Sequence, residues 1–198
     1  MDVIQFYVGY DKDLMRLLDN AKGLMGDNNF IVLHLFGSHT QYHERYPESW
    51  EVWHEKTNEA TYANTILYTD EFLRDVFEYA KENLNLQVML YFSDHGENLE
   101  KGHHPSLRTF DNARIPFFVY MSPEYQEKMP DVFQNLKAHQ NEYYTNDMMF
   151  NTISGILGAH SNHYDAKEDI SSVEYSYNRE NTLTFGGTVQ VATDKDGY

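Results

Sequence analysis

The chain has 198 residues, of which 41% are hydrophobic and 15% aromatic, so it is long enough to bury a core and too apolar to be disordered. Its formal net charge is −16, with 31 acidic residues against 15 basic ones, and such a balance repels the phosphate backbone of nucleic acids. The sequence has no cysteine, which excludes disulfides and thiolate zinc sites but leaves the compartment open.

No apolar run in the sequence approaches the length of a membrane span, and no secretory signal opens it. Two explanations follow. Either the protein is cytosolic, or its targeting and membrane segments lie upstream of this sequence. We expect the second, because the chain runs almost at once into a predicted helix.

Apolar residues at helical spacing predict three amphipathic helices, over residues 11–25, 59–83 and 145–158. Asn58 is the expected N-cap of the second helix. Thr145 is expected to cap the third helix and Gly158 to end it.

Short apolar runs bounded by turn residues predict buried strands over residues 30–36, 86–92 and 116–121. Residues 183–191 are expected to add an edge strand or hairpin. A strand, a long helix and a second strand form a crossover unit, which implies parallel neighbours in an open sheet. The sequence therefore predicts one three-layer α/β domain over residues 1–198.

The sharpest feature of the sequence is the pair Asp94-His95, directly after the second predicted strand. A carboxylate and an imidazole there offer oxygen and nitrogen ligands to a divalent ion. Gly96 would let the backbone turn tightly, so that both side chains face one point. The alternative is an ordinary strand-end turn with a solvated Asp and His. Glu97 is either an acceptor that orients a histidine or a surface residue.

Histidines gather near the predicted carboxyl edge of the sheet, where open α/β folds bind ligands, since seven of the ten lie between His34 and His104. His39 follows the first strand and fits a donor to a phosphate oxygen, or a ligand of a second metal, better than a base for Ser38. His34 is either a core histidine or a site residue. His103 and His104 either fold back over the metal or belong to a solvated loop.

Five blocks of the sequence resemble, in the same order, motifs of bacterial phosphoethanolamine transferases, which belong to the alkaline phosphatase and sulfatase superfamily. The blocks are residues 29–39 (NFIVLHLFGSH) with 45–47 (RYP), 64–70 (NTILYTD), 91–98 (YFSDHGEN), 115–120 (IPFFVY) and 179–183 (RENTL). The likeness covers nearly the whole chain.

The resemblance implies an α/β fold of the alkaline phosphatase and sulfatase type, a three-layer sandwich with a mostly parallel sheet, truncated here on its N-terminal side. The chain would be the C-terminal portion of the catalytic domain. That domain would be extracytoplasmic and joined to the bacterial inner membrane by upstream helices.

The resemblance also implies a metal-dependent, zinc-containing enzyme that moves phosphoethanolamine from the phospholipid phosphatidylethanolamine to an envelope glycan or lipid. Asp94 and His95 match metal ligands of the family. His39 matches the histidine that lines the phosphate site. His104, in preference to its neighbour His103, matches a loop histidine that binds substrate.

The family's threonine nucleophile and first acidic metal ligand match no residue of this sequence, so we expect both upstream. The chain alone should then lack the chemical step and bind zinc weakly or not at all. Thr40-Gln41 follow His39 where the lipid A-modifying members have Gly-Pro, which argues against lipid A as the acceptor. The alternatives are a sulfatase or phosphoglycerol transferase of the same superfamily, and a non-catalytic acidic α/β binding domain.

Overall fold

A computed structural model describes residues 9–104, 106–159 and 161–195. The chain forms two compact units, Met1–Leu86 and Gln87–Tyr198, and each is described by itself. The single domain expected over residues 1–198 stays a prediction.

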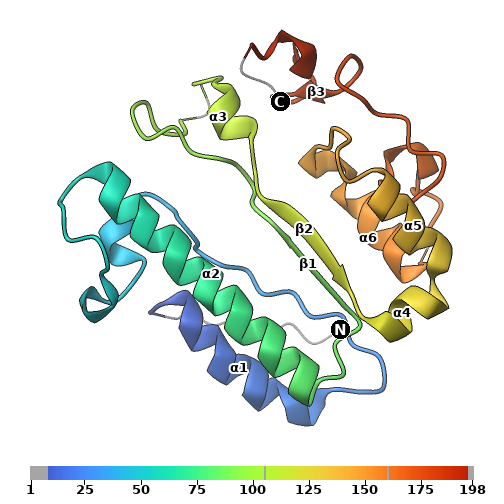
Figure 1. Ribbon diagram of the computed structural model, residues 1–198, viewed down its shortest axis with the longest axis horizontal. Coiled ribbons are helices and arrows are strands. Elements are labelled where there is room, and N and C mark those ends of the chain that lie inside the picture. The colour runs from blue at the N-terminus through green and yellow to red at the C-terminus, as the bar shows by residue number, and fades with distance from the viewer. Residues whose placement is uncertain (1–8, 105, 160, 196–198) are drawn as a thin grey trace. The chain divides into compact units, whose positions relative to one another are not determined.

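Two helices lie side by side in the first unit, α1 (Leu14–Ala21) and α2 (Asn58–Asn83) (Figure 1). The Tyr79 hydroxyl donates to Asp19 Oδ1 at 2.5 Å and joins the two helices. Both predicted helices are confirmed, and α1 is extended at each end by a 3-10 turn, Asp11–Asp13 and Lys22–Leu24. Two further turns, Tyr42–Glu44 and Glu48–Trp50, lie in the loop before α2.

Helix α2 begins one residue earlier than predicted. Thr57 is the N-cap, because its hydroxyl accepts from the Ala60 N–H at 3.2 Å, so Asn58 is wrong as the cap and is the first helical residue instead. The buried face repeats every four residues through Tyr68, Phe72 and Val76, and Phe72 is 0% exposed. This spacing is the reason why the periodicity of the sequence located the helix.

Asn64, in the block NTILYTD, ties α2 to the loop that precedes it. Its Oδ1 accepts from the N–H groups of Val52 and Trp53, at 3.1 Å each. Its Nδ2 donates to Trp53 O at 2.8 Å and to the Tyr46 hydroxyl at 3.2 Å. A fully buried amide with all these bonds holds the loop in one conformation.

The strand predicted over residues 30–36 is wrong. The segment has no strand assignment, and no strand among the described residues pairs with it. Its apolar side chains are not buried either, since Val32 is 71% exposed. His34 is also exposed, which removes the core-histidine alternative. An apolar run becomes a strand only when a neighbour takes its backbone hydrogen bonds.

The second unit is built on an antiparallel pair, β1 (Val88–Phe92) and β2 (Phe117–Met121), with Leu90 opposite Val119. Both strands were predicted. The helices of this unit are α3 (Phe110–Ala113), α4 (Pro123–Lys128), α5 (Pro130–Ala138) and α6 (Met149–Leu157) (Figure 1). Of these, α6 was predicted, together with its end at Gly158, whose φ is +63°. Thr145 precedes the 3-10 turn Asn146–Met148 that leads into α6, but its side chain makes no capping bond.

The tail of the chain forms a small hairpin of β3 (Leu183–Thr184) and β4 (Val189–Gln190), as predicted for residues 183–191. The tail also contains the 3-10 turns Ala166–Glu168 and Val191–Thr193.

A parallel arrangement of the described strands is not observed, because β1 and β2 run in opposite directions. A parallel pair needs a long crossover between its strands, and the only regular element in the described part of the connection is the four-residue helix α3. The mostly parallel sheet and the three layers are therefore not confirmed here. No helix of the described residues is long and apolar enough to cross a membrane.

Candidate metal and phosphate site

Strand β1 delivers Asp94 and His95 to its carboxyl end, where the backbone leaves the sheet in a tight turn. The Ser93 hydroxyl donates to His95 O at 2.8 Å, and the His95 N–H donates to Asp94 Oδ1 at 3.0 Å. Asn146, at the start of the segment leading into α6, donates its Nδ2 to Asp94 O at 2.8 Å and to Ser93 O at 3.2 Å. The turn is therefore fixed by bonds on both of its sides.

Gly96 is required at this turn because the chain passes very close to the segment that contains α3. A Cβ at this position would lie 2.1 Å from Asp111 O and 2.3 Å from Arg114 O. The Gly96 N–H donates to Asn112 O at 2.9 Å. Close approach, rather than the tight turning that the sequence suggested, explains the glycine.

The His95 ring has a defined orientation and tautomer. Its Nδ1 lies 2.7 Å from Gly96 O, and because a carbonyl oxygen only accepts, Nδ1 carries the proton. In the neutral ring, Nε2 then presents a lone pair. His95 Nε2 lies 4.0 Å from Asp94 Oδ2, and the Asp94 side chain is 88% exposed.

A second histidine, His103, packs on His95. The two rings stack with centroids 4.5 Å apart. His103 Nδ1 lies 2.7 Å from Glu97 Oε2, and the Glu97 side chain is only 4% exposed. Of the two alternatives for Glu97, the structure thus supports the acceptor that orients a histidine. Its other oxygen, Oε1, is buried without a hydrogen-bond partner among the described residues.

His104, the loop histidine that the family resemblance favoured over His103, does not join this cluster. It is exposed, and its Nδ1 lies 2.8 Å from the Ser106 hydroxyl. Among the predicted residues of the second unit, the structure thus brings together Asp94, His95 and His103, but not His104.

His39 belongs to the first unit, where the turn that carries it is anchored by Asp11. The buried Asp11 carboxylate accepts from the N–H groups of Phe36 at 2.9 Å and Gly37 at 2.8 Å. Gly37 has a φ of +57°, a left-handed conformation that glycine adopts without strain. His39 itself is exposed, with Nδ1 3.3 Å from the Thr40 hydroxyl. The expected convergence of His39 with Asp94 stays a prediction.

The donor set of Asp94 and His95 fits a divalent metal such as zinc. The set combines a carboxylate oxygen and an imidazole nitrogen. Two atoms bound to one tetrahedral zinc lie roughly 3.3 Å apart, so the 4.0 Å between His95 Nε2 and Asp94 Oδ2 needs only a small side-chain rotation. A metal site also needs further ligands, and no three His, Asp or Glu residues of the described segments cluster closely enough to hold an ion.

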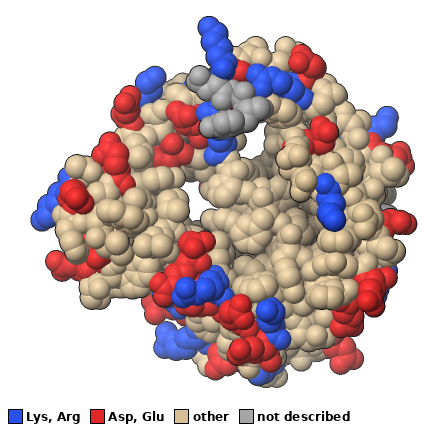
Figure 2. Space-filling view, viewed as in Figure 1, with Lys and Arg blue, Asp and Glu red and all other residues tan. Residues whose placement is uncertain are grey.

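Charge on the surface is mixed rather than segregated. Figure 2 shows acidic side chains scattered over the drawn face, with Lys and Arg beside many of them. The acidic side chains of the drawn face therefore do not form one continuous patch.

Known proteins are similar to this chain over most of its length. EptA, a phosphoethanolamine transferase of Escherichia coli K12, is 29% identical over 184 residues, which cover 81% of this chain and 34% of that protein. The Kdo(2)-lipid A phosphoethanolamine 7''-transferase of the same organism is 28% identical over 174 residues, which cover 76% of this chain and 31% of that protein. The chain thus spans about a third of the length of these curated relatives.

Two solved structures share its fold. The C-terminal periplasmic domain of EptC from Campylobacter jejuni superposes with a TM-score of 0.71 at 26% identity, covering 85% of this chain and 60% of that one. The zinc complex of the corresponding domain from Escherichia coli gives a TM-score of 0.77 at 22% identity, covering 99% and 60%. The second likeness concerns the fold alone.

A family model described as Sulfatase matches residues 3–159. This match includes both β1 and the turn with Asp94 and His95, and it covers more than half of the chain. The chain therefore belongs to the sulfatase family.

Proposed function

We propose that this chain is the C-terminal portion of the catalytic domain of a metal-dependent phosphoethanolamine transferase. The names of the relatives support this reaction, and so does the order of the motifs along the chain. The observation that carries the proposal is the arrangement after β1, where His103 stacks on His95 beside Asp94 and is held by the buried Glu97. This arrangement presents imidazole nitrogens and a carboxylate to one place, which suits a metal and a phosphoryl group.

Asp94 and His95 would hold the divalent metal, with zinc as the metal that the family resemblance implies. When bound, the metal supplies positive charge that stabilises the phosphoryl oxygens and lowers the pKa of a nucleophile. Gly96 O fixes the His95 proton on Nδ1, so that Nε2 is the ligand atom.

His103 is the residue of the second unit that we assign to the phosphoryl group. Glu97 Oε2 accepts from its Nδ1–H, and Nε2 would donate to a phosphate oxygen when the ring is protonated. The buried Glu97 carboxylate, 2.7 Å from Nδ1, holds the ring in this orientation. His39 would contribute a second donor. His104, which the resemblance favoured, would have no direct role.

The remaining parts of the active site would come from outside this chain. We propose that the nucleophile and the further metal ligands lie upstream, and that the chain alone is inactive. In the complete domain, the fold would be a three-layer sandwich with a mostly parallel sheet, as the family resemblance implies. The exposed apolar side chains of Phe30, Val32 and Phe36 support a packing partner outside this chain.

The whole protein would sit in the bacterial inner membrane, with this domain on the extracytoplasmic side. Its donor would be phosphatidylethanolamine and its acceptor an envelope glycan or lipid. The similarity to a Kdo(2)-lipid A phosphoethanolamine 7''-transferase supports a lipid or glycan acceptor of this kind.

The test is transfer by the full-length protein that contains this chain, measured as the mass gain of the acceptor. Asp94→Asn should lower the rate by about 10²–10³-fold, because one charged ligand of the metal is lost while the fold is kept. Glu100→Gln is the matched control, since Glu100 is exposed on the same loop and loses the same charge. Full activity of Asp94→Asn would overturn the proposal.

A pair of neighbouring variants tests the choice between the two loop histidines. His103→Gln should lower the transfer rate by about 10²-fold, because a donor to the phosphoryl oxygen is removed. His104→Gln should leave the rate within about twofold, since surface substitutions seldom matter. The reverse order would show that the loop rearranges in the complete enzyme.

A further inference from the structure

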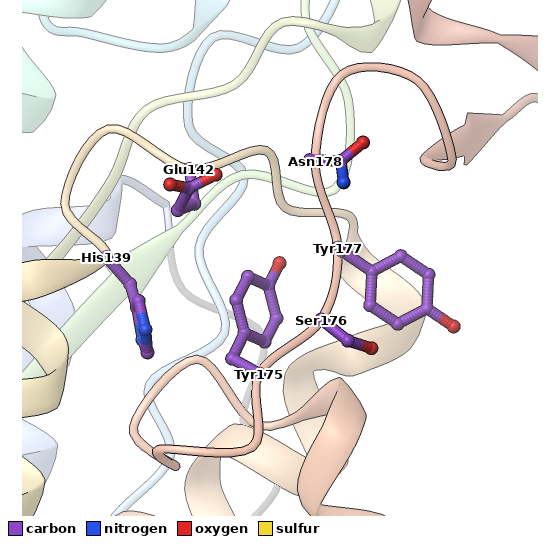
Figure 3. A pocket seen from close by; sticks show the side chains of 6 residues that line it. All are labelled: His139, Glu142, Tyr175, Ser176, Tyr177 and Asn178. Carbon is purple, nitrogen blue, oxygen red and sulfur yellow. The ribbon is translucent and has the colours of Figure 1, made fainter.

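A pocket of about 250 Å³ lies in the second unit. Its residues are distant in sequence from the turn after β1. His139 and Glu142, which follow α5, line one side, and the tail residues 175–178 line the other. In Figure 3 the ring of Tyr175 stands between the two sides, whereas the ring of Tyr177 points away from His139 and Glu142.

Three side-chain hydrogen-bond donors that line this pocket are already used inside the protein. His139 Nδ1 lies 2.8 Å from Ile170 O, so this nitrogen carries the proton and donates it to the carbonyl. The Tyr175 hydroxyl donates to Tyr143 O, and the Tyr177 hydroxyl donates to Glu168 Oε1 at 3.2 Å. These three groups therefore do not serve as donors to a ligand.

Acceptors remain on the wall. Neutral His139 keeps a lone pair on Nε2, the Tyr175 oxygen keeps its lone pairs, and Glu142 contributes a carboxylate. Glu142 is exposed, and no Lys, Arg or His of the described segments lies within ion-pair distance of it.

The site is also electronegative. Burial raises the pKa of Tyr175, and the neighbouring Tyr144 and the charge of Glu142 raise it further. For Tyr177, burial and then the charge of Glu168 raise the pKa. The charge of Glu142 therefore lies close to Tyr175, and the charge of Glu168 lies close to Tyr177.

We propose that this site binds a primary ammonium group. The three N–H donors of such a group match the three kinds of acceptor on the wall, and its charge complements Glu142. A neutral alcohol lacks the charge, a quaternary ammonium lacks the N–H donors, and an anion would meet Glu142. The inference uses no metal and no nucleophile, so it stands independently of the proposed transfer reaction.

The experiment is a titration of the ¹⁵N-labelled chain, followed by NMR at pH 8, where an ordinary histidine with a pKa of about 6.5 is neutral. The three probes are ethanolamine, ethylene glycol with a hydroxyl in place of the ammonium, and choline with the same charge but no N–H. Ethanolamine should shift the amide signals of residues 175–178 with a Kd on the order of a millimolar, as suits a ligand of so few atoms. Ethylene glycol and choline should bind at least about fivefold more weakly.

Glu142→Gln should weaken ethanolamine binding by at least about fivefold, because a charge-assisted hydrogen bond is lost. Glu174→Gln is the control, since Glu174 is exposed on the tail just before the pocket residues and does not line it. Both substitutions are at exposed positions, and unchanged spectra elsewhere will show that the fold is kept.

Choline that binds as tightly as ethanolamine would overturn the donor argument, and ethylene glycol that does so would overturn the role of charge. Absence of shifts at about 100 mM ethanolamine, roughly a hundred times the expected Kd, would overturn the site itself. Glycerophosphoethanolamine distinguishes the source of the ammonium. Equal or tighter binding identifies a lipid headgroup, and weaker binding identifies a free amine.

Discussion

Substitution of Gly96 by alanine should destabilise the second unit by about 2–4 kcal/mol. The added Cβ would lie 2.1 Å from Asp111 O and 2.3 Å from Arg114 O, about 1 Å closer than ordinary van der Waals contact. Both neighbours are backbone atoms, so no side chain can rotate away. The turn or the segment around α3 must move, and the bond from the Gly96 N–H to Asn112 O, now 2.9 Å, must stretch.

Urea unfolding followed by NMR signals of the second unit measures this loss. Gly23→Ala is the matched control, because a Cβ at Gly23 meets nothing within 4 Å and Gly23 lies in the first unit. The same spectra should show the rings of His95 and His103 shifted, since the turn sets their stacking. A Gly96→Ala protein with unchanged stability and unchanged ring signals would refute the close approach.

Three further predictions concern the first unit. Asp11→Ala should lower the free energy of unfolding by about 2–3 kcal/mol, because the N–H groups of Phe36 and Gly37 lose a charged acceptor. Asp27→Ala, at an exposed position, is the control, and equal urea midpoints for the two variants would contradict the prediction. Asn64→Ala should expose the amides of residues 52 and 53 to hydrogen exchange, and wild-type protection there would show that the amide does not hold the loop. Burial, followed by the charges of Asp13 and Asp11, raises the pKa of Tyr68 to about 12, so folding favours the neutral phenol. The contribution of Tyr68 to the free energy of unfolding is then fully present below pH 10 and falls by up to about 1.4 kcal/mol per pH unit between pH 10 and 12. Urea titrations at alkaline pH should show this fall, and Tyr68→Phe should remove it.

Helices and strands that depend on a local pattern of apolar residues could be predicted from the sequence. Helix α2 buries every fourth residue, and β1 and β2 are short apolar runs between turns, so their positions follow from periodicity. The strand predicted over residues 30–36 has the same pattern but lacks a neighbour among the described residues. Sequence pattern identifies a segment that is able to form a strand, whereas the strand itself requires a partner.

The site could be predicted only in part, for a similar reason. Asp94 and His95 are recognisable because they follow a strand directly. The choice between His103 and His104 depends on how the loop folds back, and two adjacent histidines give no signal for it. Asp11 was missed because its partners lie 25 and 26 residues away, and a lone Asp in a helical pattern reads as a solvated side chain.

The pocket around Tyr175 could not be predicted either. Its two sides are separated by more than thirty residues of sequence, as the bond from Tyr175 to Tyr143 shows. Neither side carries a motif. The sequence also does not show that donors such as His139 Nδ1 are already used, because their acceptors are carbonyl groups of the folded backbone.

Calorimetry of zinc binding to the 198-residue chain tests the central claim, that Asp94 and His95 are two ligands of a metal whose other ligands lie outside this chain. Catalytic zinc sites usually have three protein ligands, so two should bind weakly, with a Kd on the order of micromolar or above, and His95→Ala should abolish the binding. His104→Ala should leave it unchanged. A nanomolar Kd, or weak binding that persists in His95→Ala, would contradict the assignment.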